Sequence, residues 1–272
     1  MSSGVDPSSL AAAIAAVKDG LVLVVTGAGI SVASGIPTFR GTDPDAVWAN
    51  DVMELGTNAY FQRDPAGSWR WYMARFDRAR GAAPNAGHRA LVDLERWQVA
   101  RGGQFLLITQ NVDMLHDEAG TQALIKVHGS VDRVRCSRLT CTLGAPRGSI
   151  ARADVDFTAF RAEPTDANVP RCPQCRARLR QHVLWFDELY TGHADYRYED
   201  VRRAANRAEV VIFVGTSFSV GITDLILERA LDRRVAVYSI DPGGLQPDAR
   251  VRMVTSPSEV ALPAVCAALG AV

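Results

Sequence analysis

Residues 21–41 read LVLVVTGAGISVASGIPTFRG, and this stretch decides the fold. Its first five residues, Leu21 to Val25, are all apolar, as a parallel strand buried on both faces requires. The strand runs into Gly27-Ala28-Gly29, where the missing side chains let backbone N–H groups approach a phosphate. The glycine pair alone is equally typical of a tight turn between a strand and a helix. The third glycine of the usual dinucleotide fingerprint would fall on Val32.

Strands and helices are predicted to alternate along the rest of the chain. A helix at the N-terminus is expected to begin at Ser8 or Ser9 as its cap and to stop at Gly20. Further helices are predicted at 87–100 and 224–231, and further buried strands at 105–108, 124–127, 210–214 and 235–238. This alternation predicts an α/β fold with a Rossmann-like parallel sheet covered on both sides.

Two segments interrupt the alternation. Between about 129 and 181 lie four of the five cysteines, in the close pairs Cys136/Cys141 and Cys172/Cys175. Four thiolates suit tetrahedral Zn²⁺, and a metal with four protein ligands is structural; a redox pair would leave the second pair without a role. The other segment is rich in aromatic residues and predicts a small helical insertion. The expected division is a Rossmann-like domain (8–42, 85–129 and 182–272), a helical insertion (43–84) and a zinc-binding module (130–181).

Bulk composition excludes several classes of function. Thirty basic residues balance thirty acidic ones in 272 residues, and the pI is about 7.0, so no positive field is available to hold nucleic acid. The first residues lack the basic and apolar runs of a secretory signal, and Leu21–Val25 is too short to span a bilayer. We therefore expect a soluble, cytoplasmic protein, a monomer with no membrane partner.

Polar motifs follow the predicted strands, at the edge where ligands bind in open α/β sheets. They are Thr109-Gln-Asn-Val-Asp113, Val127-His-Gly-Ser130, Gly215-Thr-Ser217 and Ser239-Ile-Asp241. Asp113 by itself could be a helix cap, and an isolated histidine such as His128 is often a core residue. Histidine nevertheless titrates near neutrality and suits general-base chemistry, and its place at a strand end favours that role.

In their order along residues 10 to 269, these motifs resemble those of the sirtuins, which are NAD-dependent protein-lysine deacylases. The resemblance implies that His128 is the catalytic base and that Asn111 and Asp113 act at the nicotinamide and ribose end. It also implies that NAD is bound by Gly27, Ala28, Gly29, Ile30, Phe39, Arg40, Gln110, Asn111, Gly215, Thr216, Ser217 and Asp241. Asp241 stands where sirtuins usually have asparagine, and the stretch after Ser217 has diverged.

The segment HVLWFDE, residues 182–188, resembles the sirtuin stretch that pairs with the acyl-lysine peptide by strand addition. It implies that Val183, Trp185 and Phe186 contact the substrate, although an ordinary strand would look similar. Gln181 and Asp187 replace a usual proline and glycine.

Tyr72 and Arg75, one helical turn apart, resemble the pair by which the desuccinylase branch binds the acyl carboxylate. A surface helix could carry the same two residues. The resemblance implies removal of succinyl, malonyl or glutaryl groups, and more weakly acetyl groups, from protein lysines, with release of nicotinamide and O-acyl-ADP-ribose. The alternatives are a mono-ADP-ribosyltransferase or an NAD hydrolase on the same fold, or an NAD-binding module without catalysis.

Overall fold

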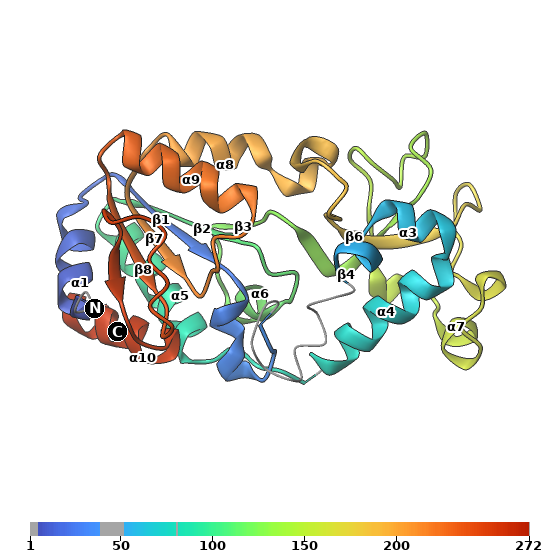
Figure 1. Cartoon of the computed structure of the whole chain (residues 1–272), viewed down its shortest axis with the longest axis horizontal. Coiled ribbons are helices and arrows are strands. Elements are labelled where there is room, and N and C mark those ends of the chain that lie inside the picture. The colour runs from blue at the N-terminus through green and yellow to red at the C-terminus, as the bar shows by residue number, and fades with distance from the viewer. Residues whose placement is uncertain (1–4, 39–51, 80, 272) are drawn as a thin grey trace.

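The structure, a computed structural model, describes residues 5–38, 52–79 and 81–271 (Figure 1). Its main body is a six-stranded sheet in which every neighbouring pair is parallel, in the order β3-β2-β1-β7-β8-β9. This confirms the predicted Rossmann-like sheet. The strands are β1 (Leu21–Thr26), β2 (Gln104–Thr109), β3 (Leu124–Lys126), β7 (Ala208–Val214), β8 (Ala236–Ile240) and β9 (Arg252–Val254).

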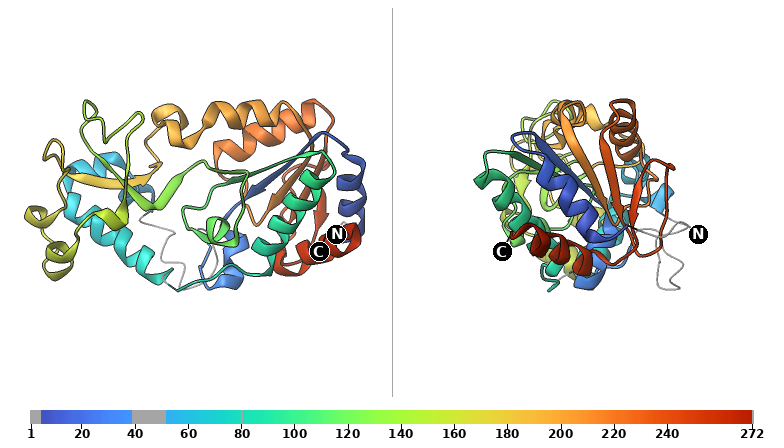
Figure 2. Two further views of the ribbon diagram at one scale, coloured as in Figure 1. Left: turned by 180° about the vertical axis from the view of Figure 1, so that it is seen from behind. Right: turned by 90° about the vertical axis from the view of Figure 1, so that its left-hand side faces the viewer.

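Helices cover both faces of this sheet (Figures 1 and 2). On one face α1 (Pro7–Ala16), α5 (Ala86–Ala100) and α10 (Ser258–Leu269) pack over a core that includes Val22, Val24 and the buried Cys266. On the other face lie α8 (Tyr198–Ala205) and α9 (Gly221–Asp232), over a core that includes Leu23 and Val25. The alternation of β1 side chains between two apolar cores explains why Leu21 to Val25 are all apolar.

Helix α1 differs from the sequence-based expectation at both ends. Its cap is Asp6, whose carboxylate accepts the N–H of Ser8, and Pro7 occupies the first helical position. The predicted serine caps were therefore wrong, because proline suits the first turn and moves the start of the helix forward. The helix also ends at Ala16, before Gly20, since Val17 is already extended.

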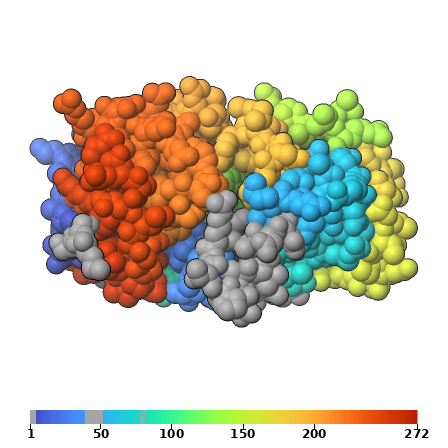
Figure 3. All heavy atoms as spheres, viewed as in Figure 1, coloured from blue at the N-terminus to red at the C-terminus, as the bar shows by residue number. Residues whose placement is uncertain are grey.

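The rest of the chain forms a second body beside the sheet domain (Figure 3). A small antiparallel sheet has the order β5-β4-β6, with β4 (Gly129–Cys136), β5 (Ile150–Ala151) and β6 (Leu179–Val183). It packs against the helices α3 (Asn58–Arg63), α4 (Pro65–Arg78) and α7 (Thr158–Ala162), and the short helix α2 (Val52–Leu55) contacts α3. The two predicted insertions share one core: the indole N–H of Trp69, on α4, donates to the carbonyl of Leu179 at 2.9 Å.

Short helical elements connect these parts. They are α6 (Leu115–Ala119) and the 3₁₀ turns η1 (Ala28–Ser34), η2 (Arg152–Asp154), η3 (Asp166–Asn168), η4 (Tyr190–Gly192) and η5 (Ala194–Tyr196). Strands β4 and β6 cross the limits proposed for the zinc module, and residues 43–51 of the proposed helical insertion lie outside the described residues. None of the helices in the described part of the chain combines the length and apolarity that a bilayer crossing requires.

Candidate active site

The strand order of the large sheet reverses between β1 and β7, and the carboxyl ends of these two strands form the floor of the site. Each strand ends in a glycine turn, and the two turns touch. The N–H of Gly29 donates to the carbonyl of Gly215 at 2.8 Å, and a Cβ on Gly27 would lie 2.7 Å from the same oxygen. Gly215 itself has a φ of 57°, which favours glycine. The glycines after β1 are therefore needed for backbone packing as well as for ligand approach.

A hydrogen-bond network joins the glycine turn to the residues after β2. The side-chain amide of Asn111 donates to the carbonyl of Gly27 at 3.1 Å and to the hydroxyl of Ser31 at 3.2 Å. Ser31 in turn donates to the carboxylate of Asp113 at 3.1 Å. The other oxygen of Asp113 accepts the N–H of Leu115, so the residue also serves the start of α6. Burial raises the pKa of Asp113, while its hydrogen bonds with Leu115 and Ser31 oppose the rise.

His128 lies between β3 and β4, directly before Gly129, with each ring nitrogen in a hydrogen bond. Nδ1 is 2.8 Å from the carbonyl oxygen of Gln110, and Nε2 is 3.1 Å from the hydroxyl of Tyr190. A carbonyl only accepts, so Nδ1 carries the proton and Nε2 presents its lone pair. Burial lowers the pKa of His128 to about 4, which keeps the ring neutral. At neutral pH His128 is thus in the tautomer that a general base requires.

The backbone beside His128 is held by the predicted substrate-binding strand. Gly129 pairs with Val183 at the end of β6, and the N–H of Leu184 donates to the carbonyl of His128 at 2.9 Å. Gly129 has a φ of 83°, and a Cβ there would collide with the carbonyl oxygen of His182. The glycine after His128 therefore lets β6 approach closely.

The predicted substrate residues occupy different environments. Val183 and Trp185 are buried, and Trp185 lies between the Phe61 ring at 5.4 Å and the Arg180 guanidinium at 3.1 Å from its ring centroid. Phe186 is 41% exposed, and its N–H donates to the carbonyl of Gly56.

Asp187, the departure from the usual glycine, accepts the N–H groups of Asn58 and Ala59 at 2.7 and 3.0 Å. Its carboxylate therefore caps α3 and ties the strand to the helical insertion. Asp187 is not among the residues with positive φ, so aspartate fits the backbone here without strain.

Glu188 is the centre of a buried ion cluster behind this strand. Its carboxylate lies 3.2 Å from Arg135 and 2.5 Å from Arg180, and it accepts the N–H of Trp185 at 3.1 Å. Burial alone would raise the pKa of Glu188, but the hydrogen bond and charge of Arg180 and the charge of Arg135 lower it. The carboxylate therefore stays ionised and holds the turn after Trp185 in place.

Tyr72 and Arg75 lie on α4, beside this cluster. The Tyr72 ring packs at 4.7 Å against Trp71 in the core of the two insertions. Burial raises the pKa of Tyr72, and the positive charges of Arg180 and Arg75 oppose the rise. The Arg75 guanidinium lies 3.5 Å from the ring centroid of Trp71 and donates to the Trp71 carbonyl. Tyr72 and Arg75 thus lie one turn apart on α4, and both contact Trp71.

The remaining predicted cofactor residues that the structure describes lie at the same sheet edge. Thr216 is buried and accepts a hydrogen bond from the Gln110 amide at 3.1 Å, whereas Ser217 is exposed. Asp241 follows β8, and its carboxylate accepts the N–H of Gly243. Ala28 and Ile30 belong to η1, with Ile30 buried in the core. Phe39 and Arg40 lie outside the described residues.

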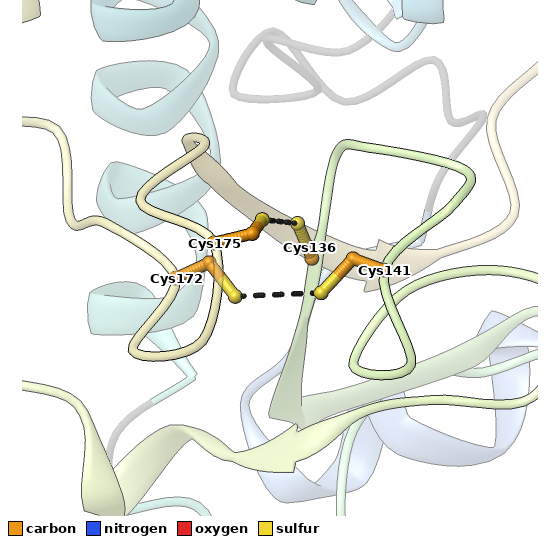
Figure 4. A group of neighbouring side chains, drawn as sticks. All are labelled: Cys136, Cys141, Cys172 and Cys175. Atoms are coloured by element: carbon orange, nitrogen blue, oxygen red, sulfur yellow. Dashed lines mark hydrogen bonds between the residues drawn. The ribbon is translucent and has the colours of Figure 1, made fainter.

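The four paired cysteines meet at one point of the second body (Figure 4). The sulfur atoms of Cys136 and Cys175 are 3.4 Å apart, and those of Cys141 and Cys172 are 3.7 Å apart. Zinc–sulfur bonds of about 2.3 Å in a tetrahedron bring thiolates to nearly these separations. The cluster fits a structural Zn²⁺ held by four thiolates and stapling β4 to the loop before β6.

A family model confirms what the motifs and geometry indicate. Residues 27–221 match the model described as "Sir2 family". The chain belongs to the Sir2 family. This match spans the glycine turn, the network around Asn111, His128, the cysteine cluster and the turn at Gly215.

Sir2 relatives with assigned activities include a Thermus thermophilus protein named NAD-dependent protein deacylase. It is 42% identical over 200 residues, which cover 73% of this chain and 70% of the relative. The "NAD-dependent deacetylase sir2E" of Dictyostelium discoideum is 30% identical over 89% of this chain and 71% of its own. Among solved structures, a Sir2 homologue in complex with NAD has a TM-score of 0.77 and 32% identity, covering 96% of this chain and 94% of that one.

Sequence reasoning missed three side chains of the site. Ser31 lies within the glycine motif, and a polar residue beside the turn was the available signal. Tyr190 and Glu188 gave no such signal, because Tyr190 is far in sequence from His128 and the arginine partners of Glu188 come from two different strands.

Proposed function

We propose that this Sir2 protein removes acyl groups from protein lysines with consumption of NAD. The observation that carries the proposal is the orientation of His128: its Nδ1–H is fixed on the Gln110 carbonyl, which makes Nε2 the atom that accepts a proton. A protein that only bound NAD would not need a neutral, oriented base at this place. The names of the relatives support the same activity.

NAD supplies an electrophilic ribose carbon and carries the acyl group away. Gly27, Gly29 and Gly215 bring two backbone turns together at the switch point of the sheet, where α/β folds bind a dinucleotide. Asn111 and Asp113, locked together through Ser31, position the nicotinamide and ribose end. His128 then accepts the proton of a ribose hydroxyl, which frees that oxygen to attack the acyl carbon.

The acyl-lysine peptide binds along the segment that begins at Val183, by adding a strand to it. This segment is fixed by Asp187 to α3 and by Glu188 to two arginines, so the peptide meets a rigid edge. Rigid edges lose little conformational freedom when a ligand binds.

We further propose a preference for acyl groups that end in a carboxylate. Tyr72 and Arg75 support it, because a guanidinium and a phenol together present several donors to a carboxylate. Loss of one charge-assisted hydrogen bond costs about 1.5–3 kcal/mol. Replacing Arg75 should therefore raise KM for a succinyl peptide by roughly 10- to 100-fold.

The test is product analysis by mass after incubation with NAD and matched acetyl- and succinyl-lysine peptides. The variants are His128→Ala and Arg75→Met, the second chosen to keep the length and apolar stem of the side chain. We expect succinyl removal that requires NAD and His128 and weakens in the Arg75 variant.

Two other outcomes would change the proposal. Acetyl removal that is indifferent to Arg75 would leave the deacylase and discard the preference for acidic acyl groups. Loss of NAD with neither peptide changed would refute deacylation and favour ADP-ribosyl transfer or NAD hydrolysis.

A further inference from the structure

The lone pair of His128 is already occupied in this structure, by Tyr190. The Tyr190 hydroxyl lies 3.1 Å from Nε2, and the two rings stack with centroids 5.7 Å apart and an interplanar angle of 28°. Because Nδ1 is protonated and bound to Gln110, Nε2 must be the acceptor and Tyr190 the donor. A ribose hydroxyl can pass a proton directly to His128 only if Tyr190 first leaves this position.

Several contacts hold Tyr190 where it is. Its ring stacks on Tyr198 with centroids 5.5 Å apart and an interplanar angle of 16°. The backbone of Ile222, in the first turn of α9, lies close enough to the Tyr190 hydroxyl to oppose the rise in its pKa. The Tyr190 ring is thus held between Tyr198 and His128, and displacing it would break contacts with both.

Burial raises the pKa of Tyr190 to about 12, so the phenol keeps its proton at neutral pH. A protonated phenol oxygen both donates and accepts hydrogen bonds. The Tyr190 oxygen can therefore accept from a ribose hydroxyl while its own proton stays directed at His128.

We propose that Tyr190 relays the proton of the ribose hydroxyl to His128. The inference rests on the proposed deacylase activity. As the ribose O–H bond breaks, its proton bonds to the Tyr190 oxygen, and the original Tyr190 proton bonds to Nε2 of His128. The ribose oxygen uses the freed electron pair to form its bond with the acyl carbon of the cationic imidate, and the C=N π pair moves onto the lysine nitrogen, which becomes neutral. Tyr190 ends neutral, as it began, and the positive charge resides on His128.

The test compares Tyr190→Phe, which keeps the stacked ring and removes the hydroxyl, with Tyr198→Phe as the matched control. Two rates are measured in each: release of deacylated peptide, and exchange of labelled nicotinamide into NAD in the presence of acyl peptide. Exchange needs only the departure and return of nicotinamide, which precede the proton transfer. We expect Tyr190→Phe to lose about 100-fold in deacylation, the lower end for general acid–base groups, and to retain exchange. Tyr198→Phe should retain both.

Deacylation by Tyr190→Phe at the parental rate would overturn the relay, and so would an equal loss of both rates, which indicates a role in shaping the site. A second measurement needs no variant: the deacylation rate is followed in mixtures of H₂O and D₂O. Because a relay moves two protons, the rate should depend on the D₂O fraction along a curve. If proton transfer limits the deacylation rate, a linear dependence of that rate on the D₂O fraction would also refute the relay. Failure of the deacylase proposal itself is distinguishable, because the unaltered protein would then neither exchange nicotinamide nor deacylate any peptide.

Discussion

Mild acid should destabilise this protein through two buried histidines beside the site, His88 on α5 and His116 on α6. Both are fully buried, and their rings lie 4.8 Å apart. Burial lowers the pKa of His88 to about 4 and that of His116 to about 3. Within the described residues, Nε2 of His88 and Nδ1 of His116 have no hydrogen-bond partner, so a proton added to the pair meets no acceptor.

The size and sign of the effect follow from proton linkage. An unfolded histidine has a pKa of about 6.5, so between about pH 4 and pH 6.5 the unfolded state binds more protons than the folded state. Stability is therefore complete above about pH 6.5 and falls as the pH decreases through this window. At about pH 5.5, one unit below the unfolded pKa, each histidine costs about 1.4 kcal/mol, and the pair costs roughly 3 kcal/mol.

Urea unfolding followed by circular dichroism at about pH 7.5 and about pH 5.5 measures the loss. Other groups also titrate, so the informative quantity is the difference between the parent and His88→Gln, which cannot take up the proton. The variant should lose about 1.4 kcal/mol less than the parent between the two pH values. An equal loss in both proteins would show that His88 is protonated in the folded state or titrates normally there, and would refute the reasoning.

Three further predictions concern the second body. Removal of zinc by a strong chelator should change the fluorescence of Trp69, because Trp69 shares a core with the cysteines. Added Zn²⁺ should restore the fluorescence, and an unchanged spectrum would contradict a structural metal. Glu188→Gln should lower the free energy of unfolding by about 3 kcal/mol, because Arg135 and Arg180 lose their counter-charge; a change below about 1 kcal/mol in urea unfolding would show that the cluster is solvated. Asp187→Ala should cost about 1 kcal/mol through loss of the α3 cap, and an unchanged urea midpoint would refute that role.

Much of the site could be predicted because its residues sit at strand ends. Once the parallel sheet is recognised, the residues after β1, β2, β3 and β7 must meet at one edge, whatever the loops do. The contacts among Ser31, Asn111 and Asp113 therefore join motifs that the sequence had already placed together. The cysteine pairs were predictable for a similar reason, since a metal imposes its own geometry on its ligands.

The sequence by itself determined the apolar strand and glycine turn at 21–29 and the alternation that builds the sheet, and it predicted the cysteine cluster and the position of His128 at the sheet edge, because each depends on local pattern or on residue chemistry. Only the tertiary structure decided that Tyr190 donates to His128, that Asp187 caps α3, and that Gly27 and Gly29 pack against Gly215. These pairs are separated by dozens to nearly two hundred residues, and their meeting depends on how both bodies pack. Local propensity carries no information about such contacts, so they could not be predicted from a pattern in the sequence.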